Sequence, residues 1–224
     1  MRTLECRSCL FAYRAAKALR QVGSTLSKTD KAGGSYAMRG SAHAPCEKHF
    51  HMRKTDLEAL ARENAFALIG KEWMLITGGT PDRFNMMTAS WGGIGWLWNK
   101  PVAFIFVRPE RHTYAFVEQN DWLTLSFYGT EAEMRKVMNF CGSASGRDHD
   151  KARETGLTPC ATEHGAVTFA QARLTLECRK LFRSPFTEEQ FLDREVLARW
   201  YNDQPGGSLH TMYVAEIANV YVND

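Results

Sequence analysis

Short β-rich runs separated by turns recur along most of this chain, and they limit its fold more than any other feature. The runs are Trp73–Thr77, Asn85–Trp91, Val102–Val107, Trp122–Tyr128, Val167–Phe182 and Leu209–Val222. Long helices do not alternate with them as they do in a parallel βαβ sheet. The pattern therefore predicts a mainly β fold, an antiparallel barrel with short helices at its edges.

Finer predictions concern the helices, the turns and two of the strands. The expected helices run from a capping box at Thr55 to about Phe66, from the Arg108–Thr113 break to Glu118, over Glu131–Phe140 and up to Thr155. Turns are expected at Gly78–Asp82 and Cys141–Gly146, and loops at Gly92–Pro101 and Thr158–Gly165. Val102–Val107 is almost wholly apolar, which predicts burial on both faces, whereas Trp122–Tyr128 alternates.

Charge divides the 224-residue chain into two parts. Residues 1–51 contain nine Lys or Arg against three Asp or Glu, and residues 52–224 contain nineteen against twenty-two. We therefore expect a basic, disordered arm or non-native extension over 1–51, with Met52 as a natural start, and one domain over 52–224. That domain is not basic, so nucleic acid is not its expected partner.

Six cysteines occur without a secretory signal, which predicts a reduced, cytoplasmic protein. No apolar run approaches the roughly 20 residues that span a bilayer, so no membrane association is expected. Cys141 and Cys178 lie among apolar residues and are interpreted as buried, unreactive thiols. Cys6, Cys9, Cys46 and His49 have zinc-ligand spacing within each pair, which leaves a zinc-binding arm as an alternative.

The stretch Asn85–Trp98 combines small hydroxylated residues, glycines and three tryptophans. Glycine lets a ligand approach the backbone, and tryptophan can shield an aromatic ring from water. The stretch therefore indicates a surface for a flat, polar-edged aromatic ligand. An ordinary core strand with an aromatic-capped turn explains the same residues.

Two clusters have the composition of anion sites. Arg108, Arg111 and Thr113 lie where a buried strand meets a helix N-terminus, and Ser145–Lys151 supplies a second group of donors. Together they suggest a phosphate tail on the aromatic ligand, although a solvated turn paired with Glu110 or Glu118 fits the first cluster equally well. His210, at a strand end, is either a hydrogen-bonded structural residue or a donor to the reacting edge of a redox ring.

A dinucleotide-binding Rossmann site is not expected. Gly93 and Gly95 lack the third glycine of that fingerprint, and the residues that follow do not open a helix.

From Asn64 onward the sequence resembles the flavoredoxin and flavin reductase family, which has an FMN-binding split-barrel fold. The segments that carry the resemblance are Asn64–Trp73, Trp73–Thr77, Asn85–Trp91, Arg108–Thr113, Cys141–Ser143, Ser145–Lys151 and His210–Thr211. The residues before Met52 have no counterpart. His112 is a departure, since tyrosine would be expected there.

The resemblance implies a homodimer of Greek-key split barrels that binds FMN near the subunit interface. It assigns the contacts with the isoalloxazine and ribityl groups to Asn85, Thr88, Ala89, Ser90 and Trp91. It assigns the phosphate to Arg111, Thr113 and Lys151, with Arg147 and Asp148 shaping that corner. It places His210, the candidate catalytic residue, near the flavin or nicotinamide edge, and it implies no metal.

The leading functional prediction is an FMN-dependent oxidoreductase that uses NAD(P)H to transfer hydride to the isoalloxazine ring. A rival is a flavoredoxin-type electron carrier whose FMN is reduced by a protein partner. A third hypothesis is a non-catalytic binding protein whose arm holds zinc or nucleic acid.

Overall fold

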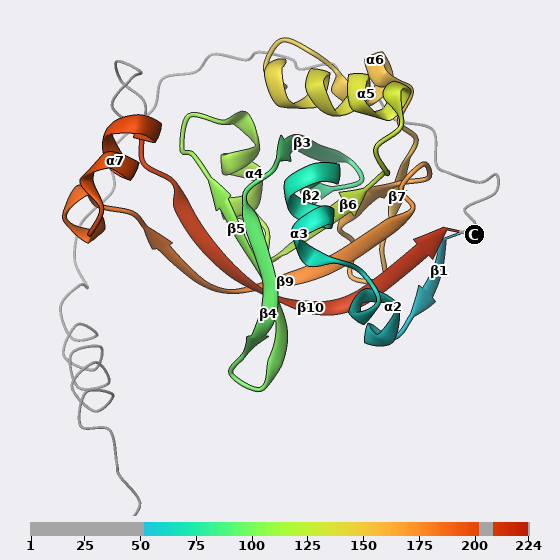
Figure 1. Ribbon diagram of the computed structural model, residues 1–224. Helices are drawn as coiled ribbons and strands as arrows, with labels where there is room; N and C mark the ends of the chain where they lie inside the picture. Colours follow the sequence, from blue (N-terminus) through green and yellow to red (C-terminus); the bar gives the residue numbers. More distant parts are fainter. Residues whose placement is uncertain (1–51, 202–207, 224) are drawn as a thin grey trace, which may run out of the picture. The chain divides into compact units, whose positions relative to one another are not determined.

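The computed structural model describes residues 52–201 and 208–223, and this part of the chain is built on one antiparallel sheet (Figure 1). The eight-stranded sheet has the order β3-β2-β6-β9-β10-β5-β4, with β1 also paired to β10. Its strands are β1 Met52–Thr55, β2 Met74–Thr80, β3 Arg83–Ala89, β4 Gly92–Leu97, β5 Lys100–Val107, β6 Trp122–Phe127, β9 Leu174–Pro185 and β10 Thr211–Asn223. The short strands β7 (Pro159–Ala161) and β8 (Val167–Phe169) form a separate pair. The predicted mainly β fold is confirmed.

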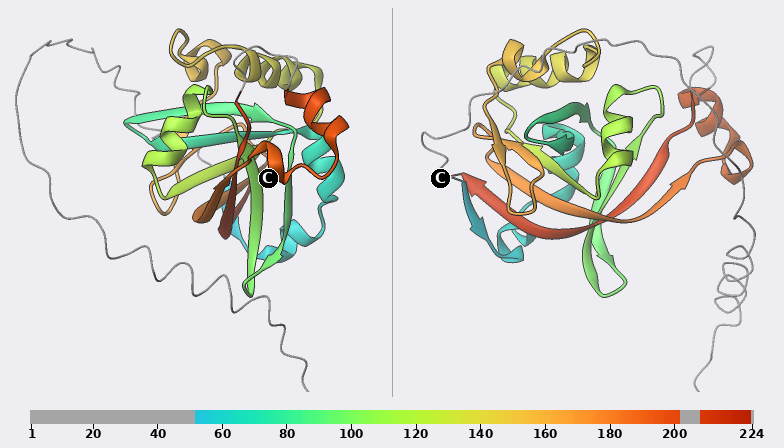
Figure 2. Two further views of the ribbon diagram at one scale, coloured as in Figure 1. Left: turned by 90° about the vertical axis from the view of Figure 1, so that its left-hand side faces the viewer. Right: turned by 180° about the vertical axis from the view of Figure 1, so that it is seen from behind.

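Helices occupy the margins of the sheet. They are α2 Leu57–Ala61, α3 Ala65–Ala67, the π-helix Leu68–Glu72, α4 His112–Gln119, α5 Ala132–Ser143, α6 Lys151–Thr155, the 3-10 helix Glu188–Gln190 and α7 Arg194–Tyr201. Helices α5 and α6 lie together on one side, whereas α7 lies beyond the ends of β9 and β10 (Figures 1 and 2).

Strand β10 is the central element of the sheet, because it pairs with β1, β5 and β9. Its register with β9 shifts between Val214 and Ala215 and again between Ile217 and Asn219. Such irregularities bend a strand and increase its twist. Both long strands accordingly curve across the molecule (Figure 1).

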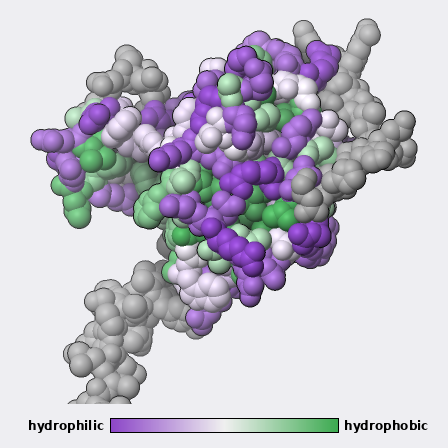
Figure 3. Space-filling view, turned by 45° about the vertical axis from the view of Figure 1, so that its right-hand side comes forward, coloured by the Kyte–Doolittle hydropathy of each residue, from purple (hydrophilic) through white to green (hydrophobic). Residues whose placement is uncertain are grey.

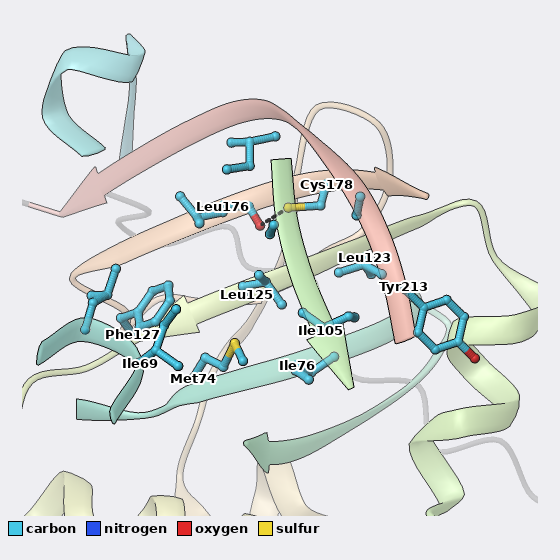
Figure 4. Packing of buried hydrophobic residues seen from close by; sticks show 14 of the residues in the cluster. Ile69, Met74, Ile76, Ile105, Leu123, Leu125, Phe127, Leu176, Cys178 and Tyr213 are labelled. Carbon is cyan, nitrogen blue, oxygen red and sulfur yellow. Dashed lines mark hydrogen bonds between the residues drawn. The ribbon is translucent and has the colours of Figure 1, made fainter. Parts of the chain in front are cut away.

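The main core lies against the concave side of these curved strands. Figure 4 shows Ile76, Ile105 and Leu125 meeting there, and all three are at most 1% exposed. Cys178 belongs to this cluster, and Cys141 belongs to a second one beneath α5 and α6. Both thiols are fully buried, and burial raises the pKa of each, that of Cys141 to about 11, as expected for unreactive cysteines.

Strand β6 forms where the alternation predicted a strand, and both of its faces are covered. Thr124 donates a hydrogen bond to the carbonyl oxygen of Val167, and Ser126 bonds the hydroxyl of Thr168 at 3.0 Å. The hydroxylated face of β6 thus packs on β8. The alternating residue types correctly indicate two different faces. The hydroxyl groups of the polar face form hydrogen bonds with β8 and not with water.

Four predicted boundaries are wrong. The first helix divides into α2, capped by Asp56, and α3, capped by Asn64, because each carboxylate or amide accepts from the backbone that follows. Strand β2 continues through Gly78 and Gly79, since both pair with β3, and α5 continues through Cys141 to Ser143. Gly92–Leu97, expected as a loop, is strand β4 and pairs with β5.

Burial of β5 also differs from expectation. Ala103, Ile105 and Val107 are buried on one face, but Phe104 and Phe106 on the other face are partly exposed. Helix α7 and strand β7 were not predicted, and the single predicted run Val167–Phe182 is divided into β8 and the first part of β9. The arm, its zinc-type spacing and the boundary at Met52 concern residues 1–51, which lie outside the described residues.

The described surface is mixed in polarity. Figure 3 shows hydrophobic residues lying between hydrophilic ones on one face. Among residues 52–201 and 208–223, no helix combines the length and apolar character needed to cross a membrane.

Gly78 is expected to be essential for the packing of α4 on β2. A Cβ atom there would lie 2.9 Å from the backbone nitrogen of Val117 and 3.0 Å from the carbonyl carbon of Phe116. We expect Gly78→Ala to lower the free energy of unfolding by about 1–3 kcal/mol, because backbone atoms cannot move aside freely. The control is Gly70→Ala, where a Cβ meets nothing within 4 Å, and urea denaturation measures both. Equal stabilities for the two variants would contradict this packing.

Candidate functional site

A cavity of about 560 Å³ opens beside the end of β3. Three segments distant in sequence form most of it: the end of β3 with the residues after it, the end of β5 with the first turn of α4, and the segment that follows α5. Its lining residues are Asn85, Met87, Thr88, Ala89, Ser90, Trp91, Phe106, Arg108, Glu110, Arg111, His112, Thr113, Ser143, Ala144, Ser145, Gly146, Arg147, Lys151 and His210.

Buried hydrogen bonds fix the β3 wall of the cavity. The amide nitrogen of Asn85 donates to Oγ1 of Thr113 at 2.8 Å, and both residues are almost fully buried. Thr88 donates to the carbonyl oxygen of Met138 at 2.6 Å, which joins β3 to α5. Gly146 passes so close to Asn85 that a Cβ would lie 2.0 Å from its Oδ1. The wall is therefore formed before any ligand arrives.

Two arginines bring positive charge to the rim beside α4. Arg111 Nη1 donates to the carbonyl oxygen of Gly142 at 2.8 Å, and Arg147 Nη1 donates to that of Glu110 at 3.3 Å. A guanidinium has five N–H groups, so each arginine retains donors for an anion. The first turn of α4 has no side-chain cap, and its free N–H groups favour negative charge there.

Lys151 is a buried brace as well as a cation. Its Nζ donates to the carbonyl oxygens of Met86 at 2.8 Å and Cys141 at 2.9 Å. Burial lowers its pKa from the ordinary lysine value, and nearby Arg111 lowers it further. Two of its three ammonium protons are used for bracing, which leaves one for a ligand.

The opposite end of the cavity is aromatic. The ring centroids of Trp91 and His210 lie 5.4 Å apart, and His210 Nδ1 shares a hydrogen bond with the hydroxyl of Tyr201 at 2.9 Å. Burial lowers the pKa of His210 to about 4, with Arg108 contributing. His210 is therefore a neutral ring at pH 7, able to donate or accept a hydrogen bond but not acting as a cation.

His112 also lines the cavity and packs edge-on against Phe116, with ring centroids 5.2 Å apart. Burial, followed by Arg147, lowers its pKa. An uncharged imidazole thus occupies the position where the family resemblance suggested tyrosine.

Ten of the residues assigned from sequence line this one cavity: Asn85, Thr88, Ala89, Ser90, Trp91, Arg111, Thr113, Arg147, Lys151 and His210. Asp148 does not line it, and its backbone nitrogen instead donates to the carbonyl oxygen of Ser145 at 3.1 Å. Sequence reasoning missed Phe106, Met87 and Ala144. Phe106 had a visible signal, since it precedes the Arg108 cluster on the same strand, but its uniformly apolar strand indicated core.

The described residues contain no group of three or more His, Cys, Asp or Glu side chains placed to hold a metal ion.

Comparison with known families identifies the class of the protein. A family model described as a flavin reductase like domain matches residues 66–224, so the chain belongs to that family. No match was found among curated proteins.

Solved structures share the fold at low identity. Flavoredoxin from Methanosarcina acetivorans is 19% identical, with a TM-score of 0.53 and 68% of this chain and 69% of that chain covered. An FMN-binding domain of a flavin reductase-like enzyme from Shewanella baltica is 16% identical, with a TM-score of 0.53 and 77% of each chain covered. An FMN-binding protein from Thermus thermophilus is 15% identical, with a TM-score of 0.52 and 88% and 83% covered.

The lowered pKa of His210 has a consequence for stability. An unfolded histidine titrates near pH 6.5, whereas folded His210 titrates near pH 4, so the unfolded chain takes up the proton first as the pH falls. The contribution of neutral His210 is present above pH 6.5 and is lost as the pH falls toward 4. Because the site is partly solvated, we expect a loss of about 1–2 kcal/mol across that interval.

His210→Gln is expected to make this decline in the free energy of unfolding shallower. Urea denaturation of both proteins at several pH values between 4 and 7 measures the difference. Parallel curves would show that His210 titrates normally.

Proposed function

We propose that the cavity binds FMN and that the protein is an NAD(P)H-dependent flavin oxidoreductase. The observation that carries the proposal is that one cavity combines the cations Arg111, Arg147 and Lys151 with the aromatic side chains of Trp91 and His210. FMN has a matching combination, with a phosphate at one end and a flat, polar-edged ring at the other. Membership of the flavin reductase-like family supports the proposal, as does the FMN-binding protein among the structures that share the fold.

The residues of the chain would hold FMN rather than react with it. Arg111 and Arg147 would donate to the phosphate, and the remaining proton of Lys151 would reach the same group. Backbone and hydroxyl groups from Thr88 to Ser90 would meet the ribityl chain and the polar ring edge. Neutral His210, oriented by Tyr201, would hydrogen-bond at the ring end without placing a charge there.

When bound, FMN supplies the redox chemistry by accepting a hydride from NAD(P)H. A nicotinamide donor that stacks on the flavin needs no Rossmann motif in this chain. The alternative is a flavoredoxin-type carrier, in which FMN stays bound and a redox protein supplies the electrons.

An anaerobic titration separates these two functions. The protein is loaded with FMN, desalted, and followed by its visible flavin absorbance while NADH and then NADPH are added. Bleaching by either nucleotide supports the reductase. A flavin that stays bound and oxidised would overturn the reductase and favour the carrier.

The phosphate assignment predicts the effect of removing its arginines. Arg111→Met and Arg147→Met should each weaken FMN binding about tenfold or more, because each removes a charge-assisted hydrogen bond of about 1.5–3 kcal/mol. The control is Arg153→Met on α6, which removes the same charge outside the lining of the cavity. Quenching of flavin fluorescence gives the dissociation constants. Equal losses in all three variants would point to general charge rather than to a phosphate site.

We also propose that the protein is a homodimer. Trp96 and Trp98 on the β4–β5 hairpin are 67% and 56% exposed, and Phe182 beside Trp98 is 45% exposed. Exposed aromatic side chains of this kind are typical of an interface. Light scattering should give twice the chain mass, and Trp96→Lys with Trp98→Lys should reduce it; a monomeric wild-type protein would contradict the proposal.

A further inference from the structure

A second cavity, of about 370 Å³, lies next to the first and differs from it in chemistry. It is lined by aromatic and aliphatic side chains, and none of its lining residues is charged. We call it the aromatic cavity, and the residues that line it are Trp91, Phe106, Phe186, Phe191, Val196, Trp200 and Tyr201.

A chain of ring contacts holds the aromatic cavity in shape. Phe186 lies 5.7 Å from Phe106 and 5.9 Å from Phe191, and Phe191 lies 5.3 Å from Tyr201, all between ring centroids. The backbone nitrogen of Phe186 donates to the carbonyl oxygen of His210 at 2.9 Å. These edge-on and tilted ring contacts hold the side chains in place at the surface.

Arg108 fixes helix α7, which carries one wall of this cavity. Its Nη2 donates to the carbonyl oxygen of Trp200 at 2.8 Å, and its guanidinium lies 5.1 Å from the ring centroid of Tyr201. A cation at the C-terminal end of a helix stabilises the helix there. Arg108 lines the first cavity but not the aromatic cavity.

The two cavities are continuous, because Trp91 and Phe106 line both. Trp91 also packs edge-on against Trp200, with ring centroids 5.2 Å apart. The hydrogen-bonded pair His210 and Tyr201 stands at the same junction, with one residue lining each cavity. A molecule in the aromatic cavity would therefore adjoin the ring end of the first cavity.

Charge decides which class of molecule fits. An anion in the aromatic cavity would meet no charged side chain among the lining residues. The two guanidinium groups nearby are already engaged, Arg108 with the carbonyl oxygen of Trp200 and Arg199 with the Trp200 ring, 5.1 Å from its centroid. An uncharged flat ring would instead exchange water for aromatic faces, in a space of the size typical for small-molecule ligands. A phosphate-bearing nucleotide fits the cationic cavity better.

We propose that the aromatic cavity binds an uncharged, flat aromatic compound and holds it beside the ring end of the FMN site. The functional significance of this inference rests on the proposed function, because the compound would share the site with the flavin. Binding itself depends only on the residues of the aromatic cavity.

Isothermal titration calorimetry with 2-naphthol tests the proposal, using the full chain with and without saturating FMN. We expect one molecule of 2-naphthol to bind in both states, and 2-naphthoate, a carboxylate of similar shape, to bind at least tenfold more weakly. Equal affinity for the two compounds would overturn the proposal, as would loss of 2-naphthol binding when FMN is present.

Val196→Trp is designed to fill the aromatic cavity, and it should weaken 2-naphthol binding at least tenfold while leaving FMN affinity unchanged. Leu192→Trp is the matched control, because Leu192 is 99% exposed and does not line the cavity. Phe191→Leu, a milder change, should weaken binding several-fold and serves if Val196→Trp does not fold. Unchanged 2-naphthol affinity in the folded cavity variants would overturn the proposal.

The outcomes also separate this inference from the proposed function. Binding of FMN without 2-naphthol would reject the aromatic site alone, and binding of 2-naphthol without FMN would reject the proposed function alone. Failure of 2-naphthol to bind, together with a lower mass of Val196→Trp in light scattering, would show that the aromatic cavity is covered by a second copy of the chain.

Discussion

Strand β3 is an end of the sheet, and the need to satisfy and cover that edge shapes everything around the cavity. In the described sheet, β3 pairs with β2 along one side and has no strand partner along the other. Side-chain hydrogen bonds connect β3 to its surroundings instead. Lys151 donates to the carbonyl oxygen of Met86, Thr88 donates to α5, and Asn85 donates to α4. The polar side chains that protect this edge from water and from other strands are thus the same ones that wall the cavity.

This constraint explains why a small set of residues has two roles. Lys151 must stay buried to join β3 to the end of α5, yet it leaves one proton toward the cavity. Asn85 must face Thr113 with Gly146 against it, which leaves no room for a larger residue at that glycine. Fold stability and ligand binding therefore depend on shared contacts here, in contrast to the aromatic cavity, whose walls are mainly rings.

Much of this site could be predicted from the sequence, because its chemistry is concentrated in short segments. The residue types of Asn85–Trp91 and of the Arg111 cluster each indicated a binding site within a short segment. The family resemblance then assigned both segments to one site. What the sequence could not reveal depended on long-range packing. The sequence around Phe106 predicts a core residue, and only the position of α7 shows that it lines a cavity. The sequence around Gly78 predicts a turn, and only its pairing with Asn85 shows that it belongs to a strand.

The remaining differences have the same origin. Gly92–Leu97 is rich in glycine, which favours a loop locally, but β5 offers a partner that makes it a strand. Helix α7 has a local start signal that the sequence analysis did not use, since Asp193 accepts from the backbone nitrogen of Glu195, and the helix is held by Arg108, 92 residues away. The family resemblance grouped Asp148 with Arg147, although only Arg147 lines the cavity.

The central claim is that the cationic end of the first cavity receives the phosphate of a flavin. The most direct measurement compares the dissociation constants of FMN and riboflavin, which differ only in that phosphate. The account predicts that FMN binds at least about tenfold more tightly, because riboflavin leaves the donors of Arg111 and Arg147 without a charged partner. Equal affinities would contradict it, since the arginines would then contribute nothing to flavin recognition.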